Sequence, residues 1–147
     1  MPLCRGRTVL NPPTADAADD YWNKRLGATG ATPRRMEEVP QAACETVEAV
    51  DGVHLTQLAV GEEMSVQQFH IEPGAAVPEH SHHHEQVGYV AKGTFTFHVN
   101  GEEYVIGPGD SYVIPSEEPH EARNDGEEPV SGIDVFSPPR TDPDWQD

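Results

Sequence analysis

The sequence predicts a small all-β protein, folded as a barrel or a sandwich of short strands. Three observations indicate this fold class. Short β-branched and apolar segments recur from Thr46 onward at roughly the 8–12-residue spacing of all-β domains. Turn-forming residues separate these segments, and none of them has the periodicity of an amphipathic helix. The 147 residues suffice for one domain.

The first part of this region begins with two β-branched segments, 53–60 and 64–71. A Gly-Glu-Glu sequence at 61–63 connects them, which favours a hairpin. Pro73 and the glycine after it interrupt the pattern. We expect the next strand at 86–91.

The second part alternates more clearly between apolar and polar residues. In 94–99, two phenylalanines and a valine alternate with two threonines and a histidine, which is the period of a half-buried strand. The pair Asn100-Gly101 favours a two-residue hairpin, because both turn positions need positive φ. The remaining strands are expected at 103–106, 111–114, 120–124 and 130–136.

The acidic balance of the chain excludes partners that need a basic surface. Nine Lys and Arg residues against 26 Asp and Glu residues give a net charge of −17. Nucleic acids and anionic membrane surfaces both attract clustered cations. We therefore expect no nucleic acid partner and no membrane partner.

We expect a cytoplasmic protein. No apolar run approaches the roughly 20 residues that cross a bilayer, and the first residues lack the apolar stretch of a secretory signal. Cys4 and Cys44 match no paired-thiol motif, so we expect both to be reduced thiols.

The charge also divides the chain into two parts. Residues 1–35 carry six cations and three anions, whereas residues 36–147 carry three cations and 23 anions. The first part is rich in Ala, Pro, Thr and Gly and lacks apolar periodicity, which predicts a dispensable, disordered leader with Met36 as an alternative start. Residues 36–147 are then a single β domain.

The strongly acidic domain indicates adaptation to high salt. Lys92 is its single lysine. At about 1 M salt the Debye length falls to about 3 Å, which screens the self-repulsion of such a surface. An ordinary acidic cytosolic protein is the alternative.

Candidate metal ligands are concentrated in the histidine-rich segment 80–84. His80 and His82 are two residues apart, so an extended strand would present both imidazoles on one side. His120, at the start of a later strand, can supply a third nitrogen, and either Gln86 or Glu85 a fourth ligand. We expect His83 and His84 to be neighbours or rim residues and not ligands. The alternative is that the whole run consists of surface histidines with incidental metal affinity.

The wider spacing around these histidines resembles the two sequence motifs of the cupin family. The positions similar to the first motif are Gly74, His80, His82, Gln86 and Gly93, with Gln86 where most members have Glu. The positions similar to the second are Gly109, Pro115, His120 and Asn124, with Glu117 where a Gly is usual. The resemblance implies a double-stranded β-helix, that is, a jelly-roll barrel.

The same resemblance implies one divalent metal ion bound by His80, His82, Gln86 and His120. Imidazole together with oxygen suits Fe, Ni, Mn, Cu or Zn. Because the Gln86 amide is neutral, the ion keeps its full +2 charge, which favours Lewis-acid chemistry.

A second group of residues lies near the C-terminus, in Asp134-x-Phe136-x-x-x-Arg140. With the histidines, it is similar to the pectin-degradation cupins, which open the ring of 4,5-unsaturated monouronates to linear keto forms. The resemblance implies that Asp134 transfers a proton, Phe136 forms a pocket wall and Arg140 binds the substrate carboxylate. A planar guanidinium suits bidentate binding of a carboxylate. Alternatively, Phe136 packs in the core, Asp134 is solvated and Arg140 is a charge of the C-terminal tail.

The leading hypothesis is therefore a metal-dependent isomerase or lyase that converts unsaturated monouronates or related sugar acids to linear keto forms. Its partner would be a small anionic sugar acid, and we also expect a homodimer. Two alternatives remain: a non-catalytic cupin that binds a metal and a sugar acid, and a metal-dependent dioxygenase.

Overall fold

The computed structural model describes residues 7–8 and 35–141. The helical structure in these residues is one short 3₁₀ turn, η1 (Gln41–Ala43). No helix within them is long and apolar enough to cross a membrane. β1 (Arg7–Thr8) pairs antiparallel with β2 (Glu37–Glu38).

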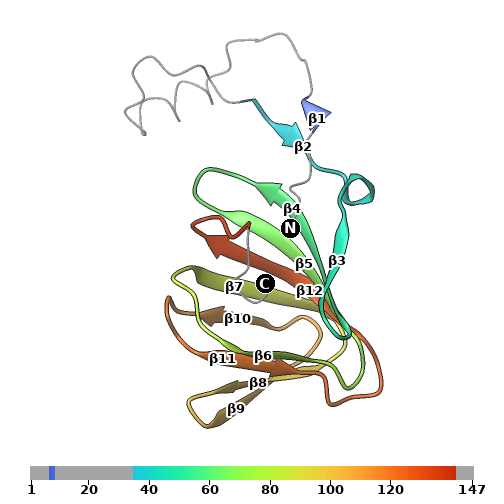
Figure 1. Cartoon of the computed structure of the whole chain (residues 1–147), viewed down its shortest axis with the longest axis vertical. Coiled ribbons are helices and arrows are strands. Elements are labelled where there is room, and N and C mark those ends of the chain that lie inside the picture. Colours follow the sequence, from blue (N-terminus) through green and yellow to red (C-terminus); the bar gives the residue numbers. More distant parts are fainter. Residues whose placement is uncertain (1–6, 9–34, 142–147) are drawn as a thin grey trace.

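The remaining strands form two antiparallel sheets (Figure 1). The six-stranded sheet has the order β10-β7-β12-β5-β4-β3 and consists of β3 (Thr46–Val50), β4 (Val53–Val60), β5 (Ser65–Ile71), β7 (Glu85–Lys92), β10 (Ser111–Ile114) and β12 (Val130–Ser137). The four-stranded sheet has the order β6-β11-β8-β9 and consists of β6 (Ala76–His80), β8 (Phe95–Val99), β9 (Glu102–Ile106) and β11 (His120–Arg123). This is the predicted all-β, jelly-roll architecture.

The two sheets enclose a common apolar core. Burial alternates along β5 and β12, so every second residue of these strands points inward. Phe69 of the first sheet stacks on Phe95 of the second, with ring centroids 5.6 Å apart. Phe97 and Tyr112 also meet across the sheets, edge-on, with ring centroids 4.7 Å apart. This alternation leaves one inner face on each sheet where polar residues can converge.

The predicted hairpin at Asn100-Gly101 joins β8 to β9, and both residues have positive φ, 51° and 78°. The predicted strand ranges do not include β1, β2, β3 or β6, although an extended strand is expected at His80 and His82. β6 contains Pro78, which argues against a central strand, but β6 is the edge of its sheet and, among the described strands, pairs only with β11. An edge strand tolerates a residue without an N–H.

Two further expectations concern the N-terminal part. The predicted disordered leader, 1–35, lies outside the described residues apart from Arg7, Thr8 and Arg35, so it stays a prediction together with the domain boundary. The expectation of a reduced thiol is wrong for Cys44, which is disulfide-bonded. Cys4 lies outside the described residues.

Candidate metal centre

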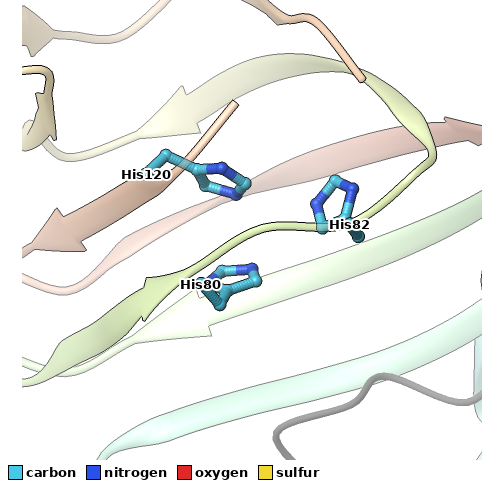
Figure 2. Close-up of side chains that lie close together, drawn as sticks. All are labelled: His80, His82 and His120. Carbon is cyan, nitrogen blue, oxygen red and sulfur yellow. The ribbon is translucent and has the colours of Figure 1, made fainter. Parts of the chain in front are cut away.

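Three histidines from the four-stranded sheet and its connection meet at one point (Figure 2). His80 is the last residue of β6, His120 is the first residue of β11, and the two are paired across the strands. One nitrogen from each of His80, His82 and His120 lies within 4.8 Å of the others. Bonds of about 2.0–2.1 Å place two ligand nitrogens roughly 3–4 Å apart on one ion. Small ring rotations would therefore let the three histidines share it.

His82 reaches this point from the segment after β6, not from the strand itself. The expectation that one extended strand presents His80 and His82 is therefore wrong in this respect. The turn between β10 and β11 holds the segment in place: the Glu117 N–H donates to the His82 carbonyl at 2.8 Å, and the Ser116 hydroxyl donates to the His83 carbonyl at 2.7 Å. Glu117 adopts a left-handed conformation, with φ 66°, where a glycine would be the usual residue.

Backbone carbonyls orient all three rings. Nδ1 of His80, His82 and His120 lies 2.8, 3.0 and 2.8 Å from the carbonyl oxygens of Pro78, His84 and Glu118. A carbonyl only accepts, so each Nδ1 carries the proton and donates it. In neutral rings the lone pair is then on Nε2. This tautomer, fixed by a backbone partner, is typical of metal-binding histidines.

The Nε2 atoms have surroundings that fit a cation. Nε2 of His120 is buried and has no hydrogen-bond partner among the residues described. Nε2 of His82 lies 3.2 Å from Oε1 of Gln86. The Gln86 amide donates toward Asp134 and Tyr112, which leaves its oxygen facing His82. Two acceptors therefore face each other, and a positive ion between them would satisfy both.

The electrostatics keep these ligands neutral. Burial, and secondarily the Arg140 charge, lower the pKa of His82 from 6.5 to about 4. Burial also lowers the pKa of His120. Metal binding requires neutral imidazole, so both residues are in the binding form at pH 7.

Asp134 lies next to this group on the inner face of β12. It is 7% exposed, and burial raises its pKa from 3.8 to about 6, although hydrogen bonds from Tyr112 and Gln86 and the Arg140 charge act in the opposite direction. The Tyr112 hydroxyl donates to Oδ1 of Asp134 at 2.5 Å. A carboxyl group with a pKa near neutrality can both accept and donate a proton.

Phe136 and Arg140 complete the site. The Phe136 ring is 1% exposed and lies edge-on to His82, with centroids 5.7 Å apart. Arg140 is 3% exposed; its backbone N–H donates to the Ser65 hydroxyl at 2.9 Å, and Cζ lies 5.2 Å from the Phe136 ring centre. The alternative of a solvated Asp134 and of Arg140 as a tail charge is therefore wrong, because both side chains are buried.

Comparisons with known proteins agree with this arrangement. Residues 67–136 match the family model described as Cupin domain. The chain is 32% identical over 93 residues to the pectin degradation protein KdgF of Dickeya dadantii (strain 3937), across 63% of this chain and 84% of the relative. The protein belongs to the cupin family. The resemblance to cupins of pectin degradation is thereby confirmed.

Two solved structures are similar to this chain. The structure of KdgF from Halomonas sp. matches with a TM-score of 0.61 and 30% identity, covering 66% of this cupin and 88% of that chain. An RmlC-like cupin from Shewanella frigidimarina matches with a TM-score of 0.62 and 30% identity, covering 68% of this cupin and 88% of that chain.

The structure brings together all seven predicted site residues of this cupin. His80, Gln86, His120, Asp134, Phe136 and Arg140 line one cavity between the sheets, and His82 lies at the histidine cluster beside it. Glu85, the alternative fourth ligand, is exposed. His83 is exposed and His84 half-buried; neither belongs to the three-histidine cluster.

Sequence reasoning missed two polar residues of this cavity, Gln67 and Tyr112. Gln67 lies opposite Asp134 on β5, is 3% exposed, and its Oε1 has no hydrogen-bond partner among the described residues. The cavity measures about 50 Å³. A single water needs roughly 10–15 Å³, so a metal with a few small ligands fits inside, whereas a sugar would extend out of the mouth.

The pKa shifts of His82 and Asp134 predict opposite effects of acid on the stability of the metal-free cupin. Unfolded histidine takes up its proton near pH 6.5, before folded His82, so acid lowers the free energy of unfolding between pH 6.5 and about 4. Folded Asp134 takes up its proton near pH 6, whereas the unfolded residue does so near 3.8. Acid therefore raises the free energy of unfolding between pH 6 and 3.8.

Asp134→Asn removes the stabilising effect of acid that Asp134 causes and keeps the destabilising effect that His82 causes. We therefore expect the free energy of unfolding in urea to fall more between pH 7 and pH 5 in Asp134→Asn than in wild type. Equal falls in the two proteins would contradict the raised pKa of Asp134.

Proposed function

We propose that this cupin converts unsaturated monouronates or related sugar acids to linear keto forms, at a metal ion held by His80, His82, His120 and Gln86. One observation carries the proposal: a buried carboxyl group and a buried guanidinium line the same cavity as the histidines. The similarity to two KdgF proteins, one of them described as a pectin degradation protein, supports the substrate class.

The donor set suits a divalent transition metal such as Fe, Ni, Mn, Cu or Zn. A bound ion would polarise a substrate oxygen as a Lewis acid. All four ligands are uncharged, so they do not reduce the charge of the ion.

Arg140 would bind the substrate carboxylate. Within residues 36–147 it is one of three cations, and it is buried at the cavity while Lys92 and Arg123 are exposed. The Phe136 ring below the guanidinium and the backbone bond to Ser65 limit its movement. A guanidinium held in this way presents two parallel donors to a carboxylate.

Asp134 would transfer the proton. In the proposed reaction the anomeric hydroxyl loses its proton and the bond from the anomeric carbon to the ring oxygen breaks, giving an aldehyde and an enol. The enol hydroxyl then loses its proton, and the neighbouring alkene carbon gains one, which gives the ketone. The change is an isomerisation without oxidant, and one carboxyl group can accept and return the proton.

Proton NMR of an anaerobic reaction tests this function. Metal-loaded protein is incubated with unsaturated galacturonate and with the unsaturated monomers derived from mannuronate and guluronate, and metal-free protein is the control. We expect the vinyl signal of the substrate to disappear in the absence of oxygen with the metal-loaded protein, and to persist with the metal-free protein. An unchanged substrate with broadened lines would indicate a binding protein, and a requirement for oxygen would indicate a dioxygenase.

Adaptation to high salt is part of the proposal. If screening relieves the repulsion among the 23 carboxylates of residues 36–147, the melting temperature should rise strongly between dilute buffer and molar KCl. Differential scanning calorimetry measures it. A melting temperature that does not respond to salt would show an ordinary acidic protein.

A homodimer and a cytoplasmic location also remain proposals. Val87, Tyr89, Val113 and Ile133 are 45%, 46%, 62% and 39% exposed, and the register places them next to one another on the outer face of β7, β10 and β12. Such an apolar surface supports a dimer, which analytical ultracentrifugation would detect.

The disulfide at Cys44 bears on the proposed cytoplasmic location. Disulfide bonds are uncommon in a reducing compartment, so this one counts against the cytoplasm.

A further inference from the structure

Tyr112 reaches Asp134 by crossing the strand between them. On the six-stranded sheet, Tyr112 of β10 lies opposite Gly88 of β7, and Gly88 lies opposite Asp134 of β12. The phenol therefore spans the width of β7 before its hydroxyl donates to Oδ1 of Asp134 at 2.5 Å. Tyr112 and Asp134 both line the cavity.

Gly88 makes this crossing possible. A Cβ atom at this position would lie 2.0 Å from Cζ and 2.2 Å from the hydroxyl oxygen of Tyr112. Any other residue at position 88 would displace the phenol. Gly88 is therefore a steric requirement for the hydrogen bond, separate from the hydroxyl itself.

We propose that Tyr112 is a positioning residue for Asp134, and that Gly88 is the position that lets it act. By holding Oδ1, the phenol restricts rotation of the carboxyl group and fixes the direction in which it meets the substrate. Misplacement of a reacting group by about 1 Å can cost roughly 10²-fold in rate. This role rests on the proposed function, in which Asp134 transfers the proton.

A purely structural role would come from ring packing instead. The Tyr112 ring contacts Phe97 and Phe95, with centroids 4.7 and 6.1 Å away. Phenylalanine at position 112 retains these contacts and removes only the hydroxyl. Tyr112→Phe therefore separates positioning from packing.

The first test is the kinetics of Tyr112→Phe on the unsaturated monouronates. We expect kcat to fall roughly 10- to 100-fold with KM within about twofold of wild type, because the hydroxyl acts on the carboxyl group and not on substrate binding. The Tyr112 hydroxyl also accepts a hydrogen bond from the Gln86 amide, which donates to Asp134 as well. Because the Gln86–Asp134 bond remains in Tyr112→Phe, metal content should not change, and elemental analysis checks this. The matched control is Tyr104→Phe, which removes a tyrosine–carboxylate bond to Glu102 on the surface and should leave kcat unchanged.

Two further variants show whether Tyr112 acts through Asp134. Tyr112→Phe should add no further loss to Asp134→Asn, since the group that it positions is already inactive. Gly88→Ala should lower kcat as Tyr112→Phe does, although the Tyr112 hydroxyl is still present in this variant. Gly107→Ala is the control and should leave kcat unchanged, because a Cβ at position 107 has only ordinary contacts at 3.5 Å or more.

Crystal structures give a measurement that does not depend on the reaction. In Tyr112→Phe we expect the Asp134 carboxyl group to rotate or to occupy two conformers, and in Tyr104→Phe to keep its position. An unmoved Asp134 would overturn the proposal, and so would multiplicative losses in the double variant. If wild type converts no monouronate, the proposed function fails, and the position of Asp134 alone decides this inference.

Discussion

Asp134→Asn should reduce turnover of unsaturated monouronates by roughly 10²-fold or more, while metal and substrate still bind. Asparagine is close to aspartate in size, but its amide cannot accept a proton at neutral pH. Steady-state kinetics gives the loss, and metal analysis together with calorimetric titration of the substrate shows that binding persists. Circular dichroism checks that the variant folds.

Arg140→Lys is the matched variant for this experiment. It keeps the charge but loses the two-pronged geometry, so KM should rise more than kcat falls. Turnover near wild type in a folded Asp134→Asn protein would remove Asp134 from the mechanism. If Asp134→Asn and Arg140→Lys changed KM and kcat in the same proportions, the separate roles of Asp134 and Arg140 would be contradicted.

Loss of the metal should follow from His120→Ala. Its Nε2 is buried at the cluster with no protein partner among the described residues, so its removal takes one ligand from a set of four. A double substitution of His80 and His82 by Ala should also abolish binding. Elemental analysis after dialysis against the metal measures occupancy, which we expect to be one ion per chain in wild type.

His83→Ala is the control, because His83 is exposed and outside the cluster. Its occupancy should stay close to wild type. Full occupancy in the double variant would show that the ion binds elsewhere, for example at the surface histidines.

The strands with clear alternation were predictable because burial on one face leaves a period-2 pattern in the sequence. The segment 94–99 and the Asn100-Gly101 turn show this, since β8 and its hairpin follow the expected pattern. The range of β6 was not predicted because its proline suits only an edge strand, and edge position depends on the whole sheet. Local sequence does not carry that information.

The site also combines residues that local sequence predicts with residues that depend on how the strands pair. Histidine spacing pointed to the three residues that now converge, although His82 arrives from a connecting segment held by the turn at Glu117. Tyr112 and Gln67 were missed because their role depends on register across β10, β7, β12 and β5. A signal did exist for Tyr112: a glycine inside a predicted strand indicates a close approach by another group, and Gly88 is such a residue.

Anomalous diffraction from a crystal soaked in Ni²⁺ or Zn²⁺, recorded at the absorption edge of the metal, tests the metal centre most directly. We predict one main peak, about 2.0–2.2 Å from Nε2 of His80, His82 and His120 and from Oε1 of Gln86. A main peak at the adjacent rings of His83 and His84, whose centroids lie 3.9 Å apart, or no peak between the sheets, would contradict it.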